Sequence, residues 1–243
     1  NGSLVYQGLG EWVTPDITSI PETFVNSYSY YPNLNILSRI AVLVGRPEQA
    51  ANYRTAMENT RRTIHRHYLN SDHSSYSIGW QGADVFPLGF HITPDSLVNN
   101  VLTHLTNHLY TNRQGHFDTG ILATPLLLEV LSEHGDSELA YTLMNQRDFP
   151  SFGYMIEKGA TTIWETWLGD QSHSHPMFGS VCQWFYEALA GIAPDPDRPG
   201  FQHLQMQPQL VTGLDYVNAT YPSPYGMIKS HWYFEQEDFI WDI

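Results

Sequence analysis

Helical segments of moderate length, separated by Gly and Pro, constrain the fold of this chain more than any other feature. Apolar residues at helical spacing, with Gly or Pro at the ends, predict helices over residues 24–44, 48–69, 93–109, 119–133, 136–145 and 181–192. These helices form pairs joined by short turns, at intervals of about 40 to 50 residues. Such a period predicts helical hairpins that stack into a solenoid or close into a toroid.

Two of the connections between the hairpins are long and aromatic, over residues 76–90 and 149–178. A plain α-solenoid that only binds other proteins is one interpretation of the helical pattern. Long ordered loops at one end of a helical frame are, however, where active sites are usually built. The pattern therefore indicates a helical frame with a functional site on its loops.

The pattern changes after Ile192. Residues 193–200, rich in Pro and Asp, cannot continue a helix and predict a linker. Beyond them, alternating or β-branched runs predict strands over 201–206, 214–221, 227–234 and 239–241, with a turn at 222–226. We expect a helical domain over residues 1–193 and the start of an incomplete antiparallel β-sandwich over 194–243, which continues beyond Ile243.

Composition excludes several function classes. The formal charge is −14 and no Lys/Arg-rich stripe is visible, so nucleic acid is not an expected partner. The single Cys182 excludes an internal disulfide framework and a Cys-based metal cluster, and its apolar surroundings predict a buried side chain. No apolar run reaches the roughly 18 to 20 residues that span a bilayer.

The chain opens at Asn1-Gly-Ser without Met, so we expect its native N-terminus to lie upstream. The compartment stays open between periplasmic, secreted and cytoplasmic, and so does the oligomeric state. Aromatic residues make up 14% of the chain. Most of them are expected in the core, whereas Trp12, Trp80, Trp164 and Trp167 lie in loops, where indoles can stack against sugar rings.

The segment 150–167 is the richest in candidate chemistry. Glu165 lies between Trp164 and Trp167, and Glu157 precedes it by eight residues. A carboxylate beside indoles is partly desolvated and suited to proton transfer. The residues alone leave alternatives: Glu165 as the partner of a buried Arg, and Glu157 as a surface or capping residue.

His173 and His175 follow in Ser172-His-Ser-His-Pro176. Two His residues without a third clustered ligand do not predict zinc, so neither a metal nor a cofactor is expected. A neutral His that donates to a substrate hydroxyl fits better. The sequence has no Gly-rich phosphate loop and no Gly-x-Ser-x-Gly elbow, which leaves carboxylates to carry the chemistry. Inverting glycoside hydrolysis uses two of them, one as acid and one as base.

Five blocks of sequence resemble one family of enzymes. They are Gly8-Leu-Gly-Glu-Trp12, Gly115-His-Phe-Asp-Thr-Gly-Ile-Leu-Ala-Thr-Pro125, Gly153-Tyr-Met-Ile-Glu-x-Gly-Ala-Thr-Thr-Ile-Trp-Glu-x-Trp167, Ser174-His-Pro-Met-Phe-Gly-Ser-Val181 and Trp184-Phe-Tyr-x-x-Leu-Ala-Gly-Ile192. Over about residues 4 to 210 the chain is similar to the bacterial α-L-rhamnosidases, glycoside hydrolase family seventy-eight. The resemblance implies a mainly α fold, part of an (α/α)6 toroid, and inverting hydrolysis of terminal α-L-rhamnosides.

The resemblance also implies roles for residues. Glu165 matches the general base that activates water, and His175 matches a residue that contacts the rhamnose. Trp12 and Trp80 match aromatic walls. Trp164 and Trp167, which flank Glu165, are further candidates for binding the substrate because they are aromatic residues in a loop. Asp118 and Glu11 match acceptors for sugar hydroxyls, although Glu11 replaces the usual Asp and lies one methylene farther out.

One departure limits what this chain can do. The family's general acid lies in an Asp-rich block upstream of the Gly-Glu-Trp loop, and this chain starts too late to contain it. We therefore expect the chain alone to be inactive. Two other functions stay open: an (α/α)6 glycosidase with another sugar specificity, and a non-catalytic rhamnose-binding or scaffold module.

Overall fold

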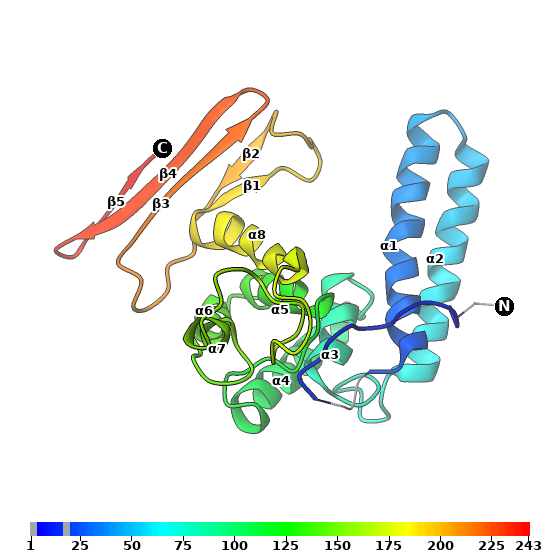
Figure 1. Cartoon of the computed structure of the whole chain (residues 1–243). Coiled ribbons are helices and arrows are strands. Elements are labelled where there is room, and N and C mark those ends of the chain that lie inside the picture. Colours follow the sequence, from blue (N-terminus) through cyan, green and yellow to red (C-terminus); the bar gives the residue numbers. More distant parts are fainter. Residues whose placement is uncertain (1–3, 17–19) are drawn as a thin grey trace.

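The computed structural model describes residues 4–16 and 20–243, so the opening Asn1-Gly-Ser lies outside the described residues. Helices form the first four-fifths of the chain and two antiparallel sheets follow (Figure 1). The helical elements are α1 Glu22–Leu43, α2 Pro47–Tyr68, α3 Gln81–Gly89, α4 Asp95–Asn107, η1 His108–Asn112, α5 Ala123–Glu133, α6 Ser137–Met144, α7 Phe152–Glu157, η2 Pro176–Val181, α8 Cys182–Trp184 and η3 Phe185–Leu189. The prediction of a mainly α fold made of helical hairpins is confirmed.

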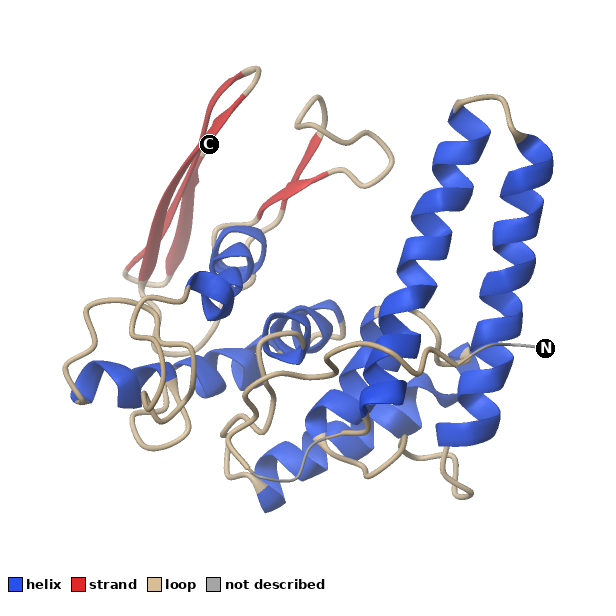
Figure 2. Cartoon of the chain, turned by 45° about the vertical axis from the view of Figure 1, so that its right-hand side comes forward, coloured by secondary structure: helices blue, strands red, loops and turns tan. Residues whose placement is uncertain are grey.

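Two hairpins use the same turn. After α1, Gly45 has φ +71° and the Arg46 N–H donates to Ala41 O. After α5, Gly135 has φ +85° and the Asp136 N–H donates to Leu131 O. A glycine at this position takes the left-handed conformation that closes a helix, and the next helix begins at once. The α1–α2 hairpin stands beside the other helices as two long antiparallel helices (Figure 2).

The prediction of a loop over 76–90 is wrong in part, because α3 lies inside it. Its residues from Gln81 to Leu88 are all buried. A Cβ on Gly82 would come within 2.9 Å of the Ile20 side chain, and one on Gly89 within 2.5 Å of the Leu126 side chain. The glycines that suggested a loop instead let α3 pack closely, and burial outweighs their low helix propensity.

The helix predicted over 119–133 begins later than expected, at Ala123. Residues 119–122 form a turn whose backbone contacts other segments, as described below. α5 then runs through the core, with Leu127, Leu128 and Leu131 fully buried. The 149–178 connection is also not all loop: it contains the short helix α7, whose Ser151 side chain accepts the Tyr154 N–H at 2.9 Å.

The helix predicted over 181–192 is a mixed element that ends at Leu189. It starts with one α-helical turn, Cys182–Trp184, and continues as the π-helix Phe185–Leu189. Gly191 has φ +69° and turns the chain into the first strand, which already contains Ile192. Cys182 is exposed, so the prediction of a buried thiol is wrong: the buried face of this element is carried by Trp184, Ala188 and Leu189 instead.

The C-terminal strands form two antiparallel sheets, one of β1 Ile192–Pro194 and β2 Leu204–Met206, the other of β3 Tyr216–Ser223, β4 Gly226–Glu235 and β5 Asp238–Asp242. The start of the predicted linker belongs to β1, and the first predicted strand shrinks to residues 204–206. The other three strands lie where they were predicted, within about two residues. Trp232 of β4 anchors the larger sheet, since its Nε1–H donates to Leu189 O at 2.7 Å.

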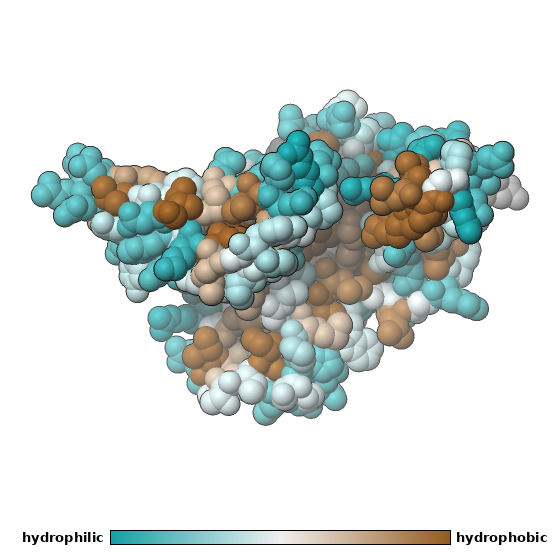
Figure 3. Space-filling view, turned by 90° about the horizontal axis from the view of Figure 1, so that it is seen from above, coloured by the Kyte–Doolittle hydropathy of each residue, from teal (hydrophilic) through white to brown (hydrophobic). Residues whose placement is uncertain are grey.

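Apolar side chains gather on the tip of the α1–α2 hairpin, seen as a brown group in the view from above (Figure 3). The exposed apolar residues of this surface are Ile36, Leu37, Ile40, Val42, Leu43 and Val44. Among the described residues, no helix is long and apolar enough to cross a bilayer.

Candidate active site

One short segment, Asp118–Ala123, contacts every other segment in which the sequence predicts a site residue. It precedes α5, and all of its residues except Leu122 are buried. Its backbone and side chains bond in turn to Gln81, to Trp167 and to residues 11–12. We call these six residues the junction segment. They bring together parts of the chain that lie up to 112 residues apart.

Glu11 and Trp12 lie against the end of the junction segment. The Glu11 Oε1 accepts the N–H groups of Leu122 at 3.2 Å and Ala123 at 3.1 Å, at the N-terminus of α5. A carboxylate is favoured there by the helix dipole and by the free N–H groups. Burial nevertheless raises the pKa of Glu11 to about 7, and its Oε2 has no hydrogen-bond partner.

Trp12 is held by its backbone while its ring stays accessible. The Trp12 carbonyl accepts the Ile121 N–H at 3.0 Å. A Cβ on Gly120 would come within 2.0 Å of that same oxygen, so only glycine allows this approach. The Trp12 side chain is 47% exposed. Its indole is therefore available to stack against a ligand.

Asp118 and Trp80 meet at the start of α3. Asp118 Oδ1 accepts the Gln81 N–H at 3.2 Å, and the Gln81 side-chain oxygen accepts the Asp118 N–H at 2.9 Å. The second oxygen, Oδ2, contacts His108 Nε2 at 2.8 Å and Arg113 Nε at 3.1 Å. Asp118 is 2% exposed, so its oxygens are engaged within the protein. Trp80, the residue before α3, is partly exposed.

Trp167 is part of the core. Its ring stacks on Phe117 at 5.2 Å and packs against Phe152 and Phe178. Its Nε1–H donates to Thr119 O at 2.9 Å, which ties the loop after α7 to the junction segment. Because only 1% of Trp167 is exposed, its ring offers no face to a sugar, contrary to the role expected for it.

Trp164 also supports the loop more than it lines a surface. Its ring stacks on His173, with centroids 4.6 Å apart, and Gly169 packs against it with no room for a Cβ. The His173 Nε2 contacts Gly169 O at 2.7 Å. Trp164 is 6% exposed. His173 is thus used within the loop, which leaves His175 as the His that faces Glu165.

Glu165 and His175 form the reactive pair of the loop. The loop is closed by the Glu165 N–H on Ser172 O and the His175 N–H on Ile163 O, both at 2.9 Å. This places His175 Nδ1 3.6 Å from Glu165 Oε2, which also accepts the Ser172 N–H at 3.3 Å. The Glu165 side chain is 20% exposed and that of His175 is 30% exposed. An accessible carboxylate held beside an imidazole can accept a proton from water.

The structure therefore joins Glu11, Trp12, Trp80, Asp118 and the Glu165 loop through the junction segment. Sequence reasoning missed Arg113, which contacts Asp118, Asp16 and the Trp80 ring at once. Spacing gave no signal for it, because its partners lie in three separate parts of the chain. Thr119 and Gln81 were also missed, because their partners Trp167 and Asp118 are distant in the sequence.

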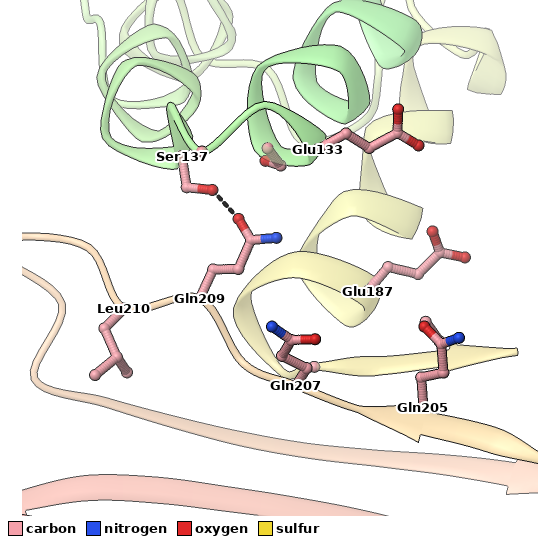
Figure 4. A pocket seen from close by; sticks show the side chains of 11 residues that line it. Glu133, Ser137, Glu187, Gln205, Gln207, Gln209 and Leu210 are labelled. Atoms are coloured by element: carbon pink, nitrogen blue, oxygen red, sulfur yellow. Dashed lines mark hydrogen bonds between the residues drawn. The ribbon is translucent and has the colours of Figure 1, made fainter. Parts of the chain in front are cut away.

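A separate hollow lies at the other end of α5. It has a volume of about 610 Å³ and is lined by Ser132 and Glu133 of α5, by Glu187 of η3 and by residues that follow α5 and η3. Figure 4 shows Glu133 and Glu187 on one side of it, and Gln209 turned toward Ser137, to which it is hydrogen-bonded. None of the predicted site residues lines this hollow.

Comparisons with known proteins agree with this arrangement. The model of the bacterial alpha-L-rhamnosidase 6 hairpin glycosidase domain matches residues 3–189, and that of the bacterial alpha-L-rhamnosidase C-terminal domain matches residues 191–243. An alpha-L-rhamnosidase of Streptomyces avermitilis is 31% identical over 236 residues, which is 93% of this chain and 22% of that protein. One from Alteromonas sp. is 29% identical, over 89% of this chain and 25% of that protein.

Solved structures show the same likeness. The structure of the Streptomyces avermitilis α-L-rhamnosidase complexed with L-rhamnose has a TM-score of 0.89 and 30% identity, over 97% of this chain and 23% of that one. The α-L-rhamnosidase from Dictyoglumus thermophilum has a TM-score of 0.87 and 31% identity, over 95% of this chain and 27% of that one. The chain spans about a quarter of the length of these relatives. Since family models match nearly all of it, the chain belongs to the bacterial α-L-rhamnosidases, of which it comprises hairpins of the helical glycosidase domain and C-terminal β structure.

Proposed function

We propose that the protein carrying this chain is an inverting α-L-rhamnosidase in which Glu165 is the general base. The carboxylate removes a proton from water as that water attacks the anomeric carbon of a terminal rhamnose. A carboxylic acid outside this chain protonates the leaving oxygen, because inverting hydrolysis needs an acid and a base on opposite sides of the bond. The substrate is a rhamnose-containing glycoside or polysaccharide.

The observation that carries this proposal is the Glu165–His175 pair. The carboxylate is accessible, it is held by a loop closed at both ends, and the imidazole lies 3.6 Å from it. His175 is thus placed to donate to a sugar hydroxyl beside the attacked carbon, while the free surface of Glu165 binds the water. Trp12 and Trp80 supply the aromatic walls, since both rings remain at least partly exposed.

The other expected site residues hold the segments that carry this pair and the aromatic walls. Both carboxylate oxygens of Asp118 are bonded to the start of α3, His108 and Arg113, and one oxygen of Glu11 is bonded to the start of α5. Trp164 and Trp167 hold the loop. We therefore assign these four residues a positioning role, and we keep direct contact with the sugar for His175, Trp12 and Trp80.

Glu165→Gln in the full-length protein tests the proposal. We expect kcat on an aryl α-L-rhamnoside to fall by about 10²-fold or more with KM little changed, as when other general bases are removed. The control is Glu157→Gln, since Glu157 is 58% exposed and, within residues 4–16 and 20–243, forms an ion pair only with the exposed Arg147. Near-normal turnover of Glu165→Gln would remove Glu165 from this role. Product of retained anomeric configuration would contradict inversion.

The isolated 243-residue chain should hydrolyse no aryl α-L-rhamnoside at a measurable rate, because it supplies the base without the acid. Turnover by the isolated chain would place an acid among its own carboxylates. A panel of other aryl glycosides on the full-length protein separates rhamnose specificity from specificity for a different sugar. Binding of rhamnose without turnover would indicate a binding module.

A further inference from the structure

Arg113, just before the junction segment, touches three segments of the site at once. Its Nε lies 3.1 Å from Asp118 Oδ2, and its Nη1 lies 2.6 Å from Asp16 Oδ2. Its guanidinium carbon is 5.0 Å from the centroid of the Trp80 ring. The side chain is 23% exposed, so these contacts occupy most of its surface.

Each of these partners is tied to an aromatic wall. Asp118 accepts the Gln81 N–H and so fixes the main chain next to Trp80. Arg113 lies over the ring of Trp80 and so restricts the side chain as well. Asp16 lies four residues after Trp12 in the chain. Glu11 holds the segment around Trp12 on α5, and the Arg113–Asp16 pair holds the same segment at a second point.

Arginine is suited to this position and lysine is not. A planar guanidinium donates in several directions within its plane while its face lies on an indole. A lysine ammonium is a compact point charge without the fixed planar fork of donors, and it has no face to stack on an indole. Arg113 is also the only arginine or lysine recorded within 4.0 Å of the buried Asp118 carboxylate, among the described residues.

We propose that Arg113 is a positioning residue for the sugar site: it sets the Trp80 and Trp12 walls relative to each other by clamping Asp16, Asp118 and the Trp80 ring. The inference rests on the proposed function, in which these indoles bind the sugar. Arg113 does not contact Glu165 or His175, so its loss weakens binding of the sugar more than the chemical step.

Arg113→Lys in the full-length protein is the first test. We expect KM for an aryl α-L-rhamnoside to rise about tenfold and kcat to change less than about threefold. Asp16→Asn removes only the ion pair between Arg113 and the exposed Asp16, and should raise KM about threefold. The control, Arg61→Lys, alters an exposed ion pair with Glu58 on α2 and should leave both constants unchanged.

A double-mutant cycle distinguishes positioning from a general loss of structure. If Arg113 acts through Trp80, Arg113→Lys adds little to the rise in KM already caused by Trp80→Ala. Additive effects on KM, or a fall in kcat at constant KM, would overturn the inference. Should Arg113→Lys fail to fold, Asp16→Asn in the same cycle decides between these outcomes.

A spectroscopic measurement separates this inference from the proposed function. The contribution of Trp80 to fluorescence is the difference between the wild type and Trp80→Phe. Arg113→Lys should make this contribution more accessible to quenching by acrylamide, whether or not the protein cleaves rhamnosides. Absence of wild-type turnover would contradict the proposed function. Equal quenching of Trp80 in the wild type and in Arg113→Lys would contradict the positioning role of Arg113.

Discussion

Glu11 is a buried carboxyl whose two oxygens have different surroundings. Oε1 accepts two N–H groups of the first turn of α5, and Oε2 has no partner. Burial is the largest cause of its raised pKa and outweighs the backbone hydrogen bonds. Near neutral pH the folded protein therefore holds a proton on Glu11 more readily than the unfolded chain, in which the pKa of this carboxyl is near 4.5.

The stability of the fold should depend on this proton. Because the folded state binds this proton more tightly, the contribution of Glu11 to the free energy of unfolding is fully present below about pH 4.5 and is lost as the pH rises through about 7. The full shift corresponds to about 3 kcal/mol, as an upper estimate. Glu11→Gln keeps the acceptor for α5 and cannot ionise, so it should flatten this fall. Urea denaturation between pH 4 and 8 measures how steeply the free energy of unfolding falls with pH in the wild type and in Glu11→Gln.

Glu129 provides the comparison for that experiment. Burial, with Glu187 and Glu133 nearby, raises the pKa of Glu129 to about 7 in the second half of α5. Its ionisation also lowers the free energy of unfolding as the pH rises. Glu129→Gln should therefore reduce the same fall in stability by an amount that adds to the effect of Glu11→Gln. An identical slope in the wild type and in Glu11→Gln between pH 5 and 7 would show that Glu11 ionises normally in the folded protein.

The sequence could predict which residues carry chemistry but not which of them touch. Its blocks singled out Glu165 and His175, and the structure places them 3.6 Å apart. Exposure was harder to predict: Trp12 and Trp167 both lie in loops, yet one is 47% exposed and the other 1% exposed. Arg113 could not be found at all, since its role depends on three contacts made only after folding.

Between elements, the contact of the Glu11–Trp12 loop with the start of α5 depends on Gly120. A Cβ there would lie 2.0 Å from the Trp12 carbonyl oxygen and 2.7 Å from Glu11 Oε1. Gly120→Ala must push this loop off α5, because one of the clashing atoms is backbone and cannot rotate away. We expect a loss of about 1–3 kcal/mol in the free energy of unfolding, measured by urea denaturation.

Gly179→Ala is the matched control for that substitution. Its Cβ would meet no atom closer than Ile163 Cγ1 at 3.9 Å, and its φ is not positive. The control should be neutral or slightly stabilising, as a glycine-to-alanine change is where the backbone permits it. Equal stability of Gly120→Ala and the wild type would mean that the loop does not sit where the structure places it.

Helices and strands were predictable where local pattern and tertiary packing agree. The turn between α1 and α2 contains Gly45 and ends at Pro47, and the turn between β3 and β4 contains Pro224 and ends at Gly226. These residues favour turns in any chain, so the pattern alone placed the elements on either side. α3 was missed because Gly82, Gly89 and Pro87 are poor helix formers. Only the close approach of α3 to Ile20 and Leu126 explains those glycines, and that approach is a property of the whole domain.

On the scale of the whole molecule, a charge of −14 coexists with an apolar surface on α1. Three of its residues, Ile36, Ile40 and Leu43, lie on one side of α1, at the end of the hairpin that projects from the other helices (Figure 3). Exposed apolar surfaces of this kind promote association, whereas a large net charge opposes it. The balance between the two depends on ionic strength, because salt screens the repulsion and leaves the apolar contact in place.

The isolated chain should therefore self-associate more strongly as salt increases, measured by sedimentation velocity from 0.02 to 0.5 M NaCl. Ile40→Glu with Leu43→Glu should abolish this increase with little loss of stability, because both side chains are already exposed, by 48% and 84%. Tyr225→Glu adds negative charge at the β3–β4 turn, far along the chain from α1, and should leave association intact. If Tyr225→Glu suppressed association as well as the α1 pair does, charge rather than the apolar surface of α1 would control it.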